Sequence, residues 1–86
     1  MKVLGISPSI IHLGIAEFDF DSQRFEVRKM RLFELYEYLK ICKESIESIR
    51  IRVETEHHCN HEITFILAEM CECLEIEYDL IYCSKY

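Results

Sequence analysis

The chain has 86 residues, of which 50% are hydrophobic, 12% are aromatic and 30% are charged. This length predicts one domain spanning residues 1–86, and the composition is typical of a globular protein rather than a disordered or fibrous one. No apolar run approaches the roughly 20 residues that cross a bilayer, which excludes a transmembrane helix of that length. The formal net charge of −6 opposes phosphate binding through bulk charge, so it favours a protein partner over DNA.

The five cysteines indicate a reducing compartment. Five is an odd number, and the first residues reach Pro8 too soon to contain the apolar core of a secretory signal. A disulfide framework needs paired cysteines and an oxidising environment. We therefore expect a cytoplasmic protein whose thiols are reduced, most of them acting as small core residues.

The first thirty residues predict three strands in an antiparallel meander. Residues 2–6 form a short apolar run that stops at Ser7, Pro8 and Ser9, which is typical of a buried strand ending in a turn. Residues 13–20 and 24–30 also have strand patterns, and the polar residues between them favour a hairpin turn.

The rest of the chain predicts two helices, each followed by a strand. Residues 32–48 and 62–74 repeat apolar side chains at helical spacing, whereas residues 49–54 and 75–83 alternate. The resulting order, βββαβαβ, predicts an α/β fold. It has a five-stranded mixed sheet with right-handed parallel crossovers and two helices mainly on one face.

The last two strands predict that the other face of the sheet is open to water. Parallel strands covered on both faces read as continuous apolar runs, and these two strands do not. If they are neighbours, their polar residues would meet across them: Arg50 and Arg52 with Glu77 and Asp79. This open face is a candidate interface, to which Phe18 and Phe20 would add apolar area.

The opening of the sequence resembles a known family. Residues 3–9, VLGISPS, followed by GIA at residues 14–16, are similar to the start of the RuvC-type Holliday-junction resolvases of the RNase H-like superfamily. In that family the first strand typically reads apolar-apolar-Gly-Ile-Asp-Pro followed by Gly or Ser, and a glycine in the second strand follows after a similar gap. The order βββαβαβ matches the superfamily core over nearly the whole chain. Phage-encoded members with Asp-Pro-Ser look closest, so the resemblance implies a phage or mobile-element source.

The resemblance implies two-metal phosphodiester cleavage, in which clustered carboxylates hold Mg²⁺ or Mn²⁺. The first catalytic aspartate of the family falls on Ser7, and a neutral hydroxyl does not replace a bridging carboxylate. The second acid falls on Glu54, with Glu56 as a neighbouring weak metal ligand. The family's last acids, on a C-terminal helix, have no counterpart in residues 1–86. We therefore expect a catalytically degenerate domain without a bound cofactor, which acts as a binding module for a protein or nucleic-acid partner.

Two alternatives stay open beside this interpretation. The first is an active metal-dependent Holliday-junction endodeoxyribonuclease, which would complete its site from Glu54, Glu56, Asp19 or a second subunit. The second is a structural or inhibitory interaction protein that kept only the fold. Branched DNA and a second copy of the chain are therefore further candidate partners, beside the favoured protein partner.

Residues 54–62 hold the densest group of potential metal ligands. In a helix, His57 and His61 would share one face as a workable pair for Zn²⁺, whereas Cys59 would point elsewhere. No further spaced pair supplies the remaining ligands. The favoured interpretation of this stretch, including His58, is therefore a solvated loop before the second helix.

Overall fold

The computed structural model describes residues 1–9, 11–54 and 61–83, and its elements follow the predicted order. They are β1 (Lys2–Ser7), β2 (Leu13–Asp19), β3 (Arg24–Met30), α1 (Leu32–Cys42), a 3-10 turn η1 (Lys43–Ser45), β4 (Ile46–Glu54), α2 (His61–Cys73) and β5 (Tyr78–Cys83). None of the helices in the described part of the chain is long and apolar enough to span a bilayer.

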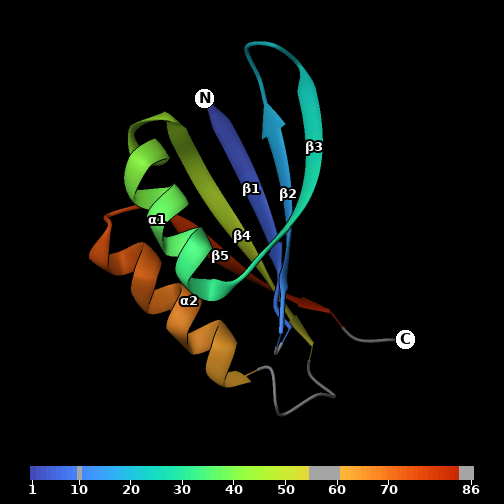
Figure 1. Ribbon diagram of the computed structural model, residues 1–86, viewed down its shortest axis with the longest axis vertical. Helices are drawn as coiled ribbons and strands as arrows, with labels where there is room; N and C mark the ends of the chain where they lie inside the picture. The colour runs from blue at the N-terminus through green and yellow to red at the C-terminus, as the bar shows by residue number, and fades with distance from the viewer. Residues whose placement is uncertain (10, 55–60, 84–86) are drawn as a thin grey trace.

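The five strands form one mixed sheet in the order β3-β2-β1-β4-β5. The first three strands are an antiparallel meander, while β4 runs parallel to both β1 and β5. Both helices lie on one side of this sheet, as Figure 1 shows, and no helix of the described residues covers the other side. The predicted α/β fold class, with its five-stranded mixed sheet and helices on one face, is confirmed.

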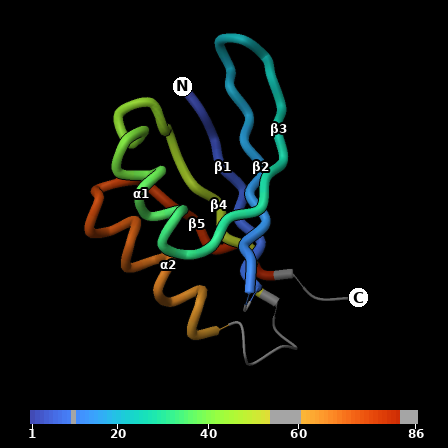
Figure 2. The backbone as a smooth tube through the Cα atoms, viewed as in Figure 1, coloured from blue at the N-terminus to red at the C-terminus, as the bar shows by residue number. Residues whose placement is uncertain are grey.

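The core lies between the central strands and the two helices. Alternate residues of the strands point toward the helices, and each of these side chains is at most 2% exposed: Leu4, Ile6, Leu13, Ile15, Ile49 and Ile51. From the helix side, Leu35 and Leu39 of α1 and Leu67 of α2 complete the cluster. At one end of the sheet the β2–β3 hairpin extends beyond the helices, as the tube in Figure 2 shows, so most of β3 is exposed.

The helix predicted over residues 32–48 ends at Cys42, and β4 begins at Ile46. The pairing of β1 with β4 skips Glu47, which marks a bulge. A bulge inserts one residue and reverses the alternation of the strand. Ile46 and Ile49 are therefore both buried at a spacing of three, which imitates the spacing of a helix.

The fifth strand begins at Tyr78, three residues later than predicted. Glu75 has a φ of 58° and ends α2 in the left-handed region. Its backbone N–H donates to the carbonyl of Glu72 at 3.1 Å, and the N–H of Ile76 donates to the carbonyl of Cys71 at 2.9 Å. This pair of hydrogen bonds is the Schellman motif that ends many helices. The residues before Tyr78 therefore form the C-terminal cap of α2 and the connection to β5, although their sequence alternates like a strand.

Candidate functional site

The two strand ends that the resemblance assigns to catalysis lie at the same edge of the sheet. Ser7 is the last residue of β1, and its side chain is exposed. β4 runs parallel beside β1, with Ile51 opposite Ile6, and ends at Glu54. Glu54 is therefore placed by its backbone alone. Its side chain, and the whole of Glu56, lie outside the described residues.

The described donors at this edge do not fit a two-metal site. Mg²⁺ and Mn²⁺ prefer carboxylate oxygens, and Ser7 offers a neutral hydroxyl in place of the implied carboxylate. Across residues 1–9, 11–54 and 61–83, no three His, Cys, Asp or Glu side chains form a group that could hold a metal ion.

Asp19 lies at the opposite end of the sheet from Ser7. It pairs with Lys2 at the start of β1, whereas Ser7 pairs with Gly14. The length of β1 separates the two positions by roughly 16 Å. The Asp19 carboxylate instead accepts a hydrogen bond from the backbone N–H of Asp21 at 3.0 Å, and this bond lowers its pKa. Asp19 of the same chain, one of the residues that the nuclease alternative offered, therefore lies far from Ser7.

The predictions for His57, His58 and Cys59 fall outside the described residues. His61 is the first residue of α2 and is exposed. The pairing of His57 with His61 around Zn²⁺ stays a prediction.

The sheet face without helices, called the open face below, contains a shallow apolar hollow of about 430 Å³. Small residues of β1 and β2 form its floor: Gly5, Ser7, Gly14 and Ala16. Larger side chains of the neighbouring strands form its walls: Val27 on one side, and Arg50, Arg52 and Ile81 on the other. The predicted open face is therefore present, and it is recessed at its centre.

Large apolar side chains continue from this hollow along β2 and β3. Phe18 pairs with Val3 on one side and Phe25 on the other, so all three share the open face. The rings of Phe18 and Phe20 meet edge-on, with 5.0 Å between their centroids. Val27 is 70% exposed and Phe25 is 65% exposed. Exposed apolar area of this extent on one sheet face is typical of an interaction surface.

The open face carries charged residues of both signs. The register places Arg50 beside Asp79, as predicted, but it places Arg52 beside Ile81. Glu77 lies just before the first residue of β5. Lys29 lies on the same face, paired with Gly14.

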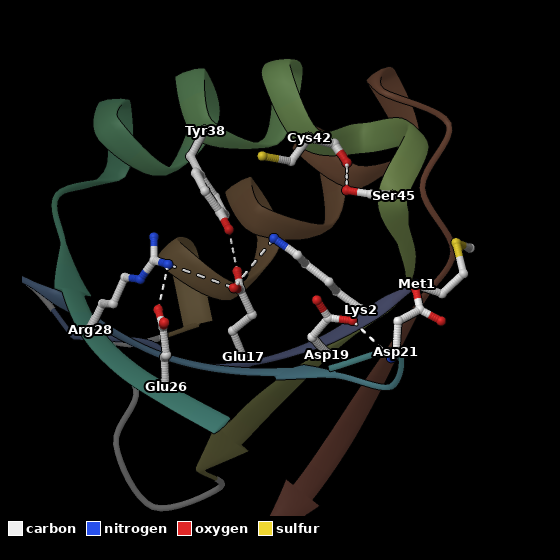
Figure 3. Close-up of polar contacts among 10 residues, drawn as sticks. All are labelled: Met1, Lys2, Glu17, Asp19, Asp21, Glu26, Arg28, Tyr38, Cys42 and Ser45. Atoms are coloured by element: carbon white, nitrogen blue, oxygen red, sulfur yellow. Dashed lines mark hydrogen bonds and ion pairs between the residues drawn. The ribbon is translucent and has the colours of Figure 1, made fainter. Parts of the chain in front are cut away.

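A second polar arrangement, which the sequence reasoning missed, lies on the helix side of the sheet. The carboxylate of Glu17 is buried between β2 and α1 and accepts a hydrogen bond from the hydroxyl of Tyr38, as Figure 3 shows. Its other oxygen, Oε2, lies 3.5 Å from Lys2 Nζ and 3.6 Å from Arg28 Nη2. The same Arg28 nitrogen contacts Glu26 Oε2 at 2.6 Å.

These contacts connect α1 to the three strands β1, β2 and β3. A buried carboxylate is tolerated when cations and hydrogen-bond donors surround it, and Glu17 has both. Burial, followed by the hydrogen bond to Glu17, raises the pKa of Tyr38, so its phenol stays protonated and continues to donate. The signal that could have found Glu17 is its place on the core side of β2, two residues after Ile15. We interpret this arrangement as structural.

The described thiols differ in burial. Cys71 is 1% exposed, and burial raises its pKa to about 11. Cys73 is exposed, because side chains two positions apart on a helix, such as those of Cys71 and Cys73, point in different directions.

Comparison with known proteins shows likeness in fold alone. No family model and no curated protein matches the sequence. Among solved structures, the chain is similar to the fowlpox virus Holliday junction resolvase, with a TM-score of 0.59 and 12% identity over 98% of this chain and 62% of that one. It is also similar to YeaZ from Pseudomonas aeruginosa, with a TM-score of 0.58 and 10% identity over 96% of this chain and 42% of that one.

The chain thus has the mixed-sheet fold of a Holliday junction resolvase while spanning 62% of that resolvase's length. The expected resemblance is confirmed at the level of the fold. The narrower RuvC-type assignment stays a prediction, because a structural similarity at 12% sequence identity does not identify a particular family.

Proposed function

We propose that this chain is a non-catalytic binding module built on a resolvase-like fold. The observation that carries the proposal is Ser7, which stands at the end of β1 where the resemblance implies a catalytic aspartate. Without that carboxylate, the end of β1 offers a neutral hydroxyl in place of an anionic oxygen that would bind Mg²⁺ or Mn²⁺. The proposal treats residues 1–86 as one degenerate RNase H-like domain, acting in the cytoplasm of a phage or mobile-element host.

A protein is the favoured partner. The net charge of −6 opposes non-specific attraction to a polyanion. The open face presents apolar side chains and a hollow lined mainly by apolar and small residues. Apolar surface of this kind contributes more to protein association than to contacts with phosphates.

The second candidate is an active junction nuclease, and two observations favour it. A solved structure with the same fold is a Holliday junction resolvase. In addition, β1 and β4 lie side by side, so Ser7 and the backbone of Glu54 share one edge of the sheet. In this case Glu54, Glu56 and a second subunit would supply the missing carboxylates for Mg²⁺ or Mn²⁺.

A cleavage assay separates the two candidates. The purified chain is incubated with a labelled four-way DNA junction and a linear duplex, with Mg²⁺ or Mn²⁺ in separate reactions. We expect no metal-dependent cleavage above the no-protein control. Cleavage of the junction that disappears in Glu54→Gln and is retained in the control variant Glu62→Gln would overturn the proposal.

Binding to the uncut junction tests the choice of partner. A gel shift at low salt is expected to show weak binding that does not distinguish the junction from the linear duplex. Tight, junction-selective binding without cleavage would keep the non-catalytic role and replace the protein partner with branched DNA. Sedimentation of the chain alone reports whether a second copy is the partner.

A further inference from the structure

The outer edge of β3 has no strand beside it in the described part of the chain. β3 stands at the end of the strand order, with β2 as its neighbour in the sheet. The β2–β3 hairpin extends beyond the helices, as Figure 2 shows, so much of this edge lies away from both of them. The edge of a sheet presents backbone N–H and C=O groups that can pair with another strand.

β3 lacks several features that protect edge strands from such pairing. Short strands, prolines and bulges are common means of protection. β3 has seven residues without a proline, and its pairing with β2 runs from Arg24 to Met30 without a shift. Its outer part also exposes apolar side chains, because Phe25 is 65% exposed and Val27 is 70% exposed. The charged residues of β3 therefore decide which strand this edge accepts.

The sequence of β3 is complementary to itself in one antiparallel register. A two-fold axis perpendicular to the sheet would pair two copies of β3 and keep the helices of both copies on one side. Each residue then faces a residue of the same parity in the second copy. With Val27 at the axis, the other facing pairs are Glu26 with Arg28, Phe25 with Lys29, and Arg24 with Met30. Opposite charges face each other twice in this register, and like charges do not face each other.

Moving the axis by one residue in either direction brings like charges together. With Glu26 at the axis, its carboxylate faces that of the second copy, and Arg24 faces Arg28. With Arg28 at the axis, two guanidinium groups face each other. Like charges directly opposite each other destabilise a sheet. The charges of β3 therefore favour the register centred on Val27.

The contacts of Arg28 within the chain are compatible with this register. Arg28 Nη2 lies 2.6 Å from Glu26 Oε2 and 3.6 Å from Glu17 Oε2, on the helix side of the sheet. The side chains of Arg28 and Glu26 are nevertheless 38% and 49% exposed. A guanidinium has five N–H donors, and a carboxylate accepts several hydrogen bonds. Each Glu26 would therefore lie between the Arg28 of its own chain and the Arg28 of the second copy.

We propose that two copies of this chain pair antiparallel through β3, with Val27 at the two-fold axis, and join their sheets into one. The inference goes beyond the proposed function and does not depend on it, because it uses no residue at the Ser7 end of β1. The two β1 strands would be five strand spacings apart, about 24 Å. This dimer would therefore not bring the two copies of Ser7 into a shared metal site.

Self-association of the unmodified chain is the first test. Sedimentation equilibrium up to about 1 mM is expected to show a monomer–dimer equilibrium with a Kd on the order of 100 μM or lower, since the interface is small.

NMR of a mixture of isotope-labelled and unlabelled copies then locates the interface. We expect intermolecular NOEs between Phe25 of one copy and Lys29 of the other. Within one chain these residues are about 13 Å apart along the strand, too far for a direct NOE.

Charge substitutions test the register. Val27→Lys places two ammonium groups at the axis, and Glu26→Lys places an ammonium group opposite Arg28. Each is expected to raise the Kd of the dimer about tenfold or more. The control variants Ile41→Lys on α1 and Glu69→Lys on α2 change the charge equally at exposed sites and should leave the Kd within about twofold. Circular dichroism identifies the variants that keep the native fold, and the NOEs of the unmodified chain do not depend on any variant.

Three results would overturn the inference. These are a monomer at about 1 mM, a dimer that folded Val27→Lys and Glu26→Lys variants do not weaken, or intermolecular NOEs confined to residues outside β3. Cleavage of the DNA junction would remove the proposed function and leave this inference in place. A monomer without cleavage would remove this inference alone.

Discussion

At the residue scale, Glu17 shows how a charged side chain is accommodated in this small core. Its side chain is 8% exposed, and a hydroxyl, an ammonium and a guanidinium surround its carboxylate. The ring of Tyr38 also lies under Arg28, with 5.3 Å between the guanidinium carbon and the ring centroid. Removing any one of these three partners leaves the Glu17 carboxylate buried with less compensation for its charge. A buried charge without full compensation destabilises the fold.

Tyr38→Phe is therefore expected to destabilise the fold. The substitution keeps the ring and removes the hydrogen bond to a charged group, which typically contributes about 1.5–3 kcal/mol. We expect the free energy of unfolding, measured by urea denaturation, to fall by about 1–3 kcal/mol. Tyr36→Phe is the control, because that side chain is exposed, and it should change the value by less than about 0.5 kcal/mol. Equal effects of the two substitutions would contradict this role.

Alkaline pH should weaken the fold through the same residue. The folded-state pKa of Tyr38 is raised, and that of Cys71 is raised to about 11, so both favour the protonated form in the folded state. Both groups stabilise the fold fully at a pH below their pKa values in the unfolded state, which are near 9 for Cys71 and about 10 for Tyr38. This stabilisation is lost as the pH rises through their higher pKa values in the folded state.

Urea denaturation between about pH 8 and pH 11 measures this loss. The free energy of unfolding should fall across that range, and it should fall less steeply in Tyr38→Phe. Curves that stay parallel for the two proteins would show that Tyr38 does not carry the effect.

At the element scale, the order and type of every helix and strand could be predicted from periodicity, whereas two boundaries could not. The bulge at Glu47 gives a strand the spacing of a helix, so local pattern alone misplaces the start of β4. At the end of α2, Glu75 adopts a left-handed conformation that usually takes glycine. No turn residue therefore marks the boundary.

Glu75→Gly tests the cap directly. A left-handed conformation costs a residue with a Cβ about 1–2 kcal/mol, and glycine avoids this cost. Glycine also loses more backbone entropy on folding, which offsets part of the gain. We expect the substitution to raise the free energy of unfolding by about 0.5–1 kcal/mol. Glu69→Gly, at an exposed site inside α2, should lower it by about 1 kcal/mol. Destabilisation by Glu75→Gly would contradict the assigned conformation.

At the scale of the whole molecule, the sequence predicted the fold better than the site. The open face and its alternating charges followed from residues 49–54 and 75–83, and the structure places Arg50 beside Asp79, which is one of the predicted neighbours. The hollow was not predicted, because it depends on Gly5, Gly14 and Ala16 becoming neighbours across two strands. Glu17 was missed for the same reason, since its partners come from three other elements.

We infer that this resolvase-like sheet, with Ser7 at the end of β1, does not bind two divalent cations between β1 and β4. A crystal structure grown in the presence of Mn²⁺ tests this most directly, because manganese is located by its anomalous scattering. We expect the strand order β3-β2-β1-β4-β5, with no ordered manganese between Ser7 and Glu54. Two well-occupied manganese ions at the shared end of β1 and β4 would contradict it.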